Sequence, residues 1–129
     1  MRFSARWHFA GTPVVYLAES PAAALLEVCV HTAANDIPPS FTLLKIGGLT
    51  RSLEIVDWSR LAEDWTAHPE ATQEIGSEWL RSGRTAHLRV PSALVPETYN
   101  YLLNPLHLQA SQFQVLQEYH YPFDQRLKG

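Results

Sequence analysis

Prolines and glycines divide this chain into short segments, and their spacing limits what each segment can form. Proline fixes φ and lacks a backbone N–H, so it tends to end a strand or begin a helix. Several short strand-like segments are interrupted by helical ones, without regular alternation. The pattern therefore predicts a mixed α+β fold, with a mostly antiparallel sheet and flanking helices, rather than a doubly wound parallel sheet.

Two segments carry helix signals. Ser20 and Pro21 supply a capping hydroxyl and a preset φ for a helix from Pro21 to about Ala34. A second, amphipathic helix is predicted over Pro69 to Arg81, with Gly83 placed to end it. Between them, Trp58 to Trp65 fits a short helix or a turn. Trp58, Trp65 and Trp79 are assigned to packing.

The strand-like segments are rich in β-branched and aromatic residues and end at glycine or proline. They are expected at 2–8 and 13–18 around a glycine turn, and then at 41–46, 53–56, 87–90 and 113–116, with a continuation to 121 left open. Prolines at 96 and 105 predict a loop over the whole of 92–105.

Glu27 is a lone carboxylate in a helix whose other residues are nearly all apolar. At helical spacing, the core-facing side is expected to carry Ala22, Leu25, Leu26, Cys29 and Ala33. Glu27 falls on the opposite face, among small side chains that leave room for a ligand or another strand. The alternative is an ordinary exposed glutamate on an alanine-rich helix.

Composition narrows the class of protein. The 129 residues suffice for one domain with a real core, and a formal charge of −3 gives no general affinity for nucleic acid or anionic membranes. The single cysteine, Cys29, excludes an internal disulfide and suits a reducing compartment. With no apolar run long enough to span a bilayer and no secretory leader, we expect a soluble cytoplasmic protein.

Other chemical motifs are weak when taken singly. The six histidines show no metal-binding helical spacing, so no metal is expected. Ser92 is not in a nucleophile elbow, and no glycine-rich phosphate loop is present. Arg6 fits either an anion clamp or a surface arginine packed on Trp7. Tyr16 fits either a sheet-face aromatic or a stacking platform.

Taken in order, these residues resemble the RES domain family, which is named for an arginine, a glutamate and a serine. The motifs that carry the resemblance are Arg6-Trp7-His8, Gly11 to Tyr16, Ser20 to His31, Val90 to Ala93 and Asn100 to Pro105. Each motif is short, but their order and approximate spacing are preserved from Arg2 to about His107. The chain is thus identified as a member of this family.

The resemblance implies a fold similar to ADP-ribosyltransferases and an NAD-consuming toxin of a RES–Xre type II toxin–antitoxin module. Such toxins cleave the nicotinamide–ribose bond with phosphate or water as acceptor, as NAD phosphorylases or glycohydrolases. The implied partner is an Xre-family antitoxin in a hetero-oligomeric complex, and no metal or cofactor is implied beyond NAD as substrate. The alternatives are ADP-ribosyl transfer to a protein, and an inactive RES fold that only binds its antitoxin.

The resemblance also assigns roles to residues. Glu27 would stabilise an oxocarbenium-like transition state, and Arg6 would bind phosphate. Tyr16 would stack on the nicotinamide, and Ser92 would hydrogen-bond the nicotinamide ribose or amide. The two asparagines of the last motif, Asn100 and Asn104, are expected to brace the loop.

The chain departs from the family pattern at its start. RES proteins normally have a further strand before the Arg-Trp block, which carries another arginine of the NAD site. Here Met1 stands almost directly before Arg6, so we expect a single RES domain over 1–129 that lacks this strand. A natural short form and a start assigned downstream of the true one both fit, and the loss would leave one phosphate clamp missing.

Overall fold

The computed structural model describes residues 7, 13–31, 33, 36, 39–48 and 52–127. The strand expected over 2–8 and the candidate residue Arg6 lie outside these residues. The described helices and strands are, in chain order, β1 (Val15–Ala18), α1 (Pro21–His31), β2 (Ser40–Gly47), β3 (Leu53–Ile55), α2 (Pro69–Ser82), β4 (His87–Pro91), β5 (Tyr99–Leu103) and β6 (Gln114–Pro122). Short 3₁₀ turns occupy 58–60, 65–67, 108–112 and 125–127.

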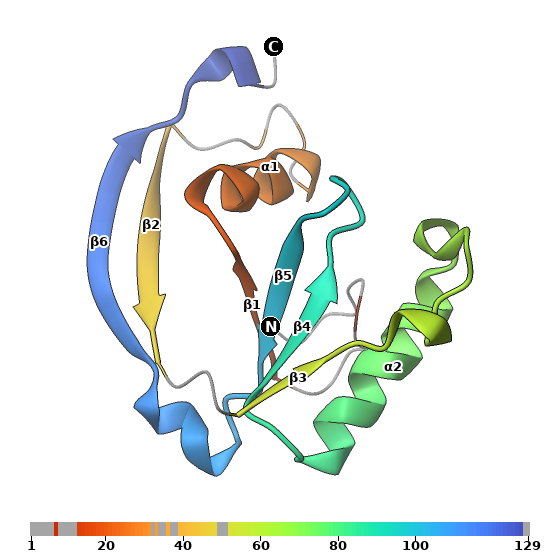
Figure 1. The fold of residues 1–129 in the computed structure, drawn as a ribbon. Coiled ribbons are helices and arrows are strands. Elements are labelled where there is room, and N and C mark those ends of the chain that lie inside the picture. Colours follow the sequence, from red (N-terminus) through yellow and green to blue (C-terminus); the bar gives the residue numbers. More distant parts are fainter. Residues whose placement is uncertain are drawn as a thin grey trace.

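The described strands form two sheets (Figure 1). A four-stranded sheet has the order β1-β5-β4-β3, in which β3 is parallel to β4 and the other pairs are antiparallel. The strands β2 and β6 form a separate antiparallel pair. The predicted α+β class, with mixed and mostly antiparallel pairing, is confirmed.

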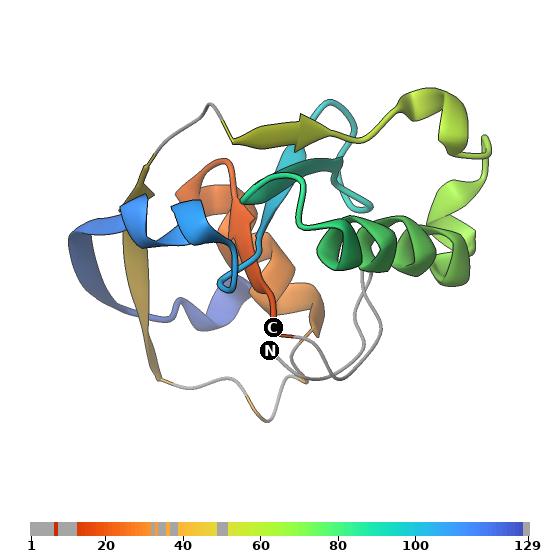
Figure 2. The same ribbon diagram turned by 90° about the horizontal axis from the view of Figure 1, so that it is seen from below.

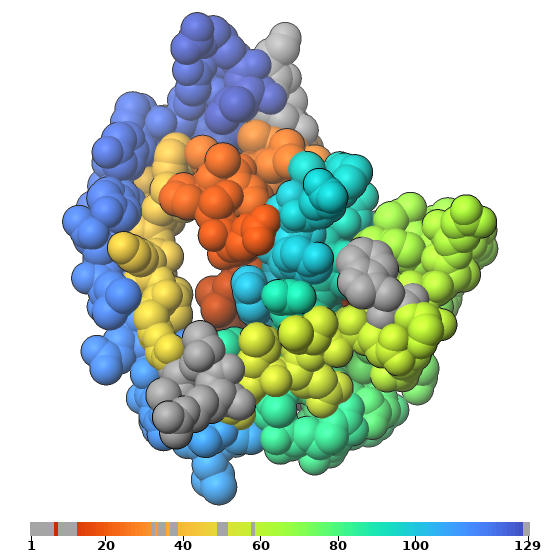
Figure 3. All heavy atoms as spheres, viewed as in Figure 1, coloured from red at the N-terminus to blue at the C-terminus, as the bar shows by residue number. Residues whose placement is uncertain are grey.

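The larger sheet lies between helix α2 and the β2–β6 pair (Figures 1 and 2). Helix α2 lies along one side of the four-stranded sheet, and the β2–β6 pair stands on the other side (Figures 1 and 2). Helix α1 lies between the β2–β6 pair and one end of the larger sheet. Figure 3 shows a hollow between β2 and the β1–α1 segment.

The hydrophobic core lies between the four-stranded sheet and α2. Its buried members are Trp7, Val14, Val56, Ile75, Trp79, Leu88, Val90 and Leu102. Burying a large apolar side chain contributes about 1.5–3 kcal/mol, so this layer supplies much of the stability. Trp79 also donates its indole N–H to Thr85 Oγ1 at 2.9 Å. The packing roles expected of Trp79 and Trp65 are confirmed, whereas the Trp58 side chain lies outside the described part.

Both helices begin and end largely as the sequence indicates. The Ala23 N–H donates to Ser20 Oγ at 3.1 Å, which is the predicted cap of α1. Helix α1 ends at His31 rather than near Ala34, and its one buried residue is Cys29, while Leu26 stays 40% exposed. Gly83 ends α2 in the left-handed conformation, with φ of 62°. Neither of these helices has the length and apolarity needed to cross a membrane.

The prediction of a loop over the whole of 92–105 is wrong, because residues Tyr99–Leu103 form strand β5. This strand lies inside the larger sheet and pairs with β1 on one side and β4 on the other. Pro96 and Pro105 flank the strand without interrupting its hydrogen bonds. These prolines, which predicted a loop, therefore lie outside the two ends of the strand.

Candidate functional site

The register of the larger sheet brings two polar side chains onto one face. Tyr16 on β1 lies opposite Leu102 of β5, and Ala18 lies opposite Asn100. Side chains two residues apart on a strand point to the same side. Tyr16 and Asn100 therefore share the face on which Leu102 is buried in the core, with Asn100 nearer the end of the sheet where α1 begins.

Helix α1 places Glu27 over this end of the sheet. Asn100 donates its Nδ2–H to Glu27 Oε1 at 3.0 Å, and His31 Nε2 lies 3.3 Å from Glu27 Oε2. The Glu27 side chain is 30% exposed, whereas that of His31 is 70% exposed. The His31 contact is an exposed i,i+4 pair of a kind worth only a few tenths of a kcal/mol. The Asn100 contact crosses from strand to helix and fixes one oxygen of a half-buried carboxylate.

This contact corrects the role expected for Asn100. Rather than bracing a loop, Asn100 belongs to β5 and binds the candidate acid. Asn104 behaves as expected, since its Oδ1 accepts a hydrogen bond from the Leu106 N–H at 3.0 Å in the turn after the strand. The sequence signal that could have separated the two is the alternating run Tyr99 to Leu103, which is typical of a strand.

Ser92 lies just beyond β4, at the same end of the sheet. Its N–H donates to the Thr98 carbonyl at 2.8 Å, which prolongs the β4–β5 ladder. Its Oγ accepts from the N–H groups of Leu94 at 3.1 Å and Val95 at 3.3 Å. Oγ is the acceptor in both bonds, so among the described residues the Ser92 hydroxyl hydrogen has no acceptor and is available to a ligand.

A pocket of about 360 Å³ lies beside this turn. It is lined by residues 91–99 together with Trp65 and Thr66. Ser92 is the only one of the candidate residues Glu27, Tyr16 and Ser92 that lines it. The pocket thus offers aromatic and backbone groups next to Ser92, while the Glu27–Asn100 pair lies outside its lining.

Tyr16 is partly buried and packs against the hydrophobic core. Burial raises the pKa of its phenol to about 12, and a backbone hydrogen bond with Trp7 opposes that shift. The phenol is therefore neutral at physiological pH. This packing accounts for the position of Tyr16 in the sheet, and its stacking on a nicotinamide ring stays a prediction.

Two further sequence expectations concern charge and metals. Arg6, the candidate anion clamp, is outside the described residues. Among the residues that are described, no group of three or more His, Cys, Asp or Glu side chains is placed to hold a metal ion.

Comparison with known proteins shows the family. The RES domain model matches residues 1–124, so the chain belongs to the RES domain family. A protein named Toxin Res from Pseudomonas putida is 42% identical over 117 residues, which cover 89% of this chain and 80% of that protein. Toxin Res from Photorhabdus laumondii is 41% identical over 106 residues, 81% of this chain and 68% of its own. The Prs ADP-ribosylating toxin of a Sphingobium species is 35% identical over 127 residues, 95% of this chain and 79% of its own.

Proposed function

We propose that this chain is the toxin of a RES–Xre toxin–antitoxin module and that it degrades NAD. Its family membership and its similarity to proteins named Toxin Res support the toxin assignment. The observation that carries the chemistry is the half-buried Glu27 carboxylate, held by Asn100 at the end of the sheet.

The reaction breaks the bond between the nicotinamide nitrogen and C1 of its ribose. The bonding electron pair leaves with nicotinamide, and positive charge develops on the ribose in an oxocarbenium-like transition state. Glu27 offsets that charge, and partial burial strengthens the attraction relative to water. Phosphate or water then adds to C1, giving ADP-ribose 1-phosphate or, after loss of a proton, ADP-ribose.

Other residues of the chain serve binding in this proposal. Arg6 binds the substrate pyrophosphate or the incoming phosphate through paired guanidinium hydrogen bonds. Ser92 donates its free hydroxyl hydrogen to the nicotinamide ribose or amide, and the pocket beside it receives part of the ligand. Tyr16 provides an uncharged ring for the nicotinamide. No metal takes part.

The test is nicotinamide release from NAD by the purified chain, with and without phosphate. Losing one positioned electrostatic contact costs about 100- to 1000-fold in rate, so Glu27→Gln should lower release by that factor. Glu19→Gln, an exposed acid just before α1, is the matched control and should stay at the wild-type rate. Release that requires phosphate identifies a phosphorylase, and release without it a glycohydrolase. Folded wild-type protein that releases no nicotinamide would overturn the proposal.

ADP-ribosyl transfer to a protein is the second candidate function. It is favoured by one observation, the 35% identity to a relative named as an ADP-ribosylating toxin. NAD labelled in its adenosine part, incubated with the chain and a bacterial lysate, separates the two functions. Label that becomes attached to protein only with an intact Glu27 supports transfer, whereas label recovered wholly as free ADP-ribose or its phosphate supports NAD degradation.

The proposed partner is an Xre-family antitoxin that covers the site. Helix α1, which carries Glu27, also exposes the apolar side chain of Val30, three positions further on and on the same side of the helix. A protein docked on this face would bury Val30 and block access to the acid. Co-expression with the product of an adjacent small Xre-like gene should give a stable complex that releases no nicotinamide. A complex that forms with a chain inactive on its own would instead indicate a RES fold that only binds its antitoxin.

A further inference from the structure

The side-chain amide of Asn100 has two polar atoms, and the described residues give a hydrogen-bond partner to only one of them. Nδ2 donates to Glu27 Oε1 at 3.0 Å, while Oδ1 is buried and has no partner in the described part of the chain. The orientation is fixed by chemistry, because turning the amide over would set its oxygen against the carboxylate, which is acceptor-only when ionised. The unpartnered atom of Asn100 is therefore an acceptor.

Among the residues that the structure describes, none supplies the missing donor to Asn100. Its cross-strand neighbours on the same face are Ala18 of β1 and Val90 of β4, and both have apolar side chains. On α1, Glu27 binds the amide and His31 contacts the other Glu27 oxygen. On β1, the phenol of Tyr16 shares the face of Asn100, two positions along from Ala18. A buried acceptor without a partner carries a desolvation penalty, and a native structure normally offsets it through a ligand, a water or a function.

We propose that Asn100 positions Glu27 and that its Oδ1 accepts a hydrogen bond from a hydroxyl or amide N–H of the bound substrate. This rests on the proposed function and adds a residue to it. Asn100 lies on β5, a central strand of the larger sheet that is paired on both sides. Its amide is therefore held more rigidly than a side chain on a loop. One amide thus couples the orientation of the acid to the presence of substrate.

Asn104 provides a matched control within the same segment. It is the same residue type, four positions further on, and only 7% exposed. Its side-chain Oδ1 accepts from the Leu106 N–H at 3.0 Å, and its backbone N–H, which an alanine would keep, donates to the Ala86 carbonyl at 2.8 Å. Removing its side chain should therefore weaken the fold without touching the site.

The first experiment compares Asn100→Ala, Asn100→Asp and Asn104→Ala in nicotinamide release from NAD, with kcat, KM and the thermal midpoint measured for each. A misplaced acid and a lost substrate contact should lower kcat/KM of Asn100→Ala by about 10- to 100-fold, mainly in kcat. Asn104→Ala should lose thermal stability and keep its kcat. Equal kcat values for the two alanine variants and the wild type would overturn the proposal.

Asn100→Asp adds a readout that a merely structural role would not move. It places a second carboxylate against Glu27, and two such groups favour sharing one proton. The shared proton restores a donor between them at lower pH, so the activity optimum of this variant should move toward acid. A pH profile that superimposes on that of the wild type would contradict the positioning role.

The side-chain amide signals of uniformly ¹⁵N-labelled protein test the contact without NAD. The Asn100 NH₂ signal should shift when Glu27 is replaced by Gln, and the Asn104 signal should not. If the wild type releases no nicotinamide while the Asn100 signal responds, the proposed function fails and the positioning contact stands. If the Asn100 signal does not respond, the positioning role fails whether or not NAD is consumed.

Discussion

The backbone carbonyl of Trp7 lies directly against Gly76 of α2, so closely that a Cβ at position 76 would overlap the Trp7 oxygen. The indole of Trp7 is buried in the core, 5.8 Å from the ring of Trp65 between centroids. Glycine at this position therefore lets Trp7 lie against the helix while its indole is buried in the core. Arg6, the candidate anion clamp, is bonded directly to Trp7.

Replacing Gly76 with alanine should destabilise the fold, by about 1–3 kcal/mol, because the added methyl group overpacks the contact with Trp7. In a helix with open space the same substitution stabilises by about 1 kcal/mol, so the sign of the change is the decisive result. Urea unfolding measures it. A midpoint at or above that of the wild type would show that Trp7 can move away at little cost.

Much of the fold could be predicted from local signals. Pro21, Pro69 and Gly83 mark helix ends by fixing or freeing φ, and these effects do not depend on the rest of the chain. The only local signal of strand β5 is the short alternating run from Tyr99 to Leu103. Its pairing partners β1 and β4 are remote or separated by a turn, and prolines near both of its ends produced the stronger local signal.

In the candidate site, too, some features could be predicted from the sequence and others could not. Glu27 could be singled out because a lone acid among apolar helix residues is visible in the sequence. Its link to Asn100 could not, since 73 positions separate the two residues and only the register of β1 with β5 brings them together. The rest of the predicted set stays a prediction, with Ser92 at the same end of the sheet and Tyr16 further along β1.

Tyr16 should make the stability of the fold sensitive to alkali. Burial raises its folded-state pKa from 10.0 to about 12. Between these values the folded state holds a proton that the unfolded state releases, so the stabilising contribution is complete below pH 10 and is lost as the pH rises toward about 12. Unfolding free energies measured across this range should fall more steeply for the wild type than for Tyr16→Phe. Parallel curves would contradict the buried phenol.

The amides of the β2–β6 pair should be less protected from hydrogen exchange than those of the larger sheet. It forms no ladder with the larger sheet, and Leu44, Val115, Leu116 and Tyr121 remain more than half exposed. A two-stranded ribbon is marginal in water without further packing. Native-state hydrogen exchange should show its amides opening at lower free energy than those of β4 and β5. Equal protection in the two sheets would contradict this prediction, which rests on the open space between β2 and the β1–α1 segment in Figure 3.

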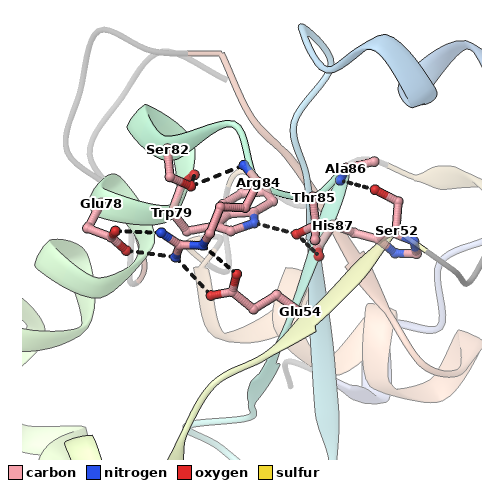
Figure 4. Close-up of polar contacts among 9 residues, drawn as sticks. All are labelled: Ser52, Glu54, Glu78, Trp79, Ser82, Arg84, Thr85, Ala86 and His87. Atoms are coloured by element: carbon pink, nitrogen blue, oxygen red, sulfur yellow. Dashed lines mark hydrogen bonds and ion pairs between the residues drawn. The ribbon is translucent and has the colours of Figure 1, made fainter.

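Arg84 joins α2 to β3 through two carboxylates (Figure 4). Its guanidinium donates to both oxygens of Glu54 and both oxygens of Glu78, at 2.7–3.0 Å. The hydrogen bonds from Arg84 hold the pKa of Glu78 below its ordinary value. The lowered pKa means that this group stabilises the fold above its unfolded-state pKa, and that the stabilisation is lost as the pH falls through the folded-state pKa.

Arg84→Ala should therefore lower the urea midpoint at neutral pH, and the difference from the wild type should shrink as the solution is acidified. Arg84→Lys keeps the charge but not the forked geometry of the guanidinium, so its urea midpoint should lie between those of Arg84→Ala and the wild type. The matched control is Arg81→Ala, since Arg81 makes one exposed contact of 3.4 Å with Glu74 and should matter little. A double-mutant cycle with Glu78→Gln should give a coupling that shrinks in acid, because Arg84 lowers the pKa of Glu78. A second cycle with Glu54→Gln isolates the contact with β3, and a coupling of zero there would show that the bridge does not hold strand β3 to the helix.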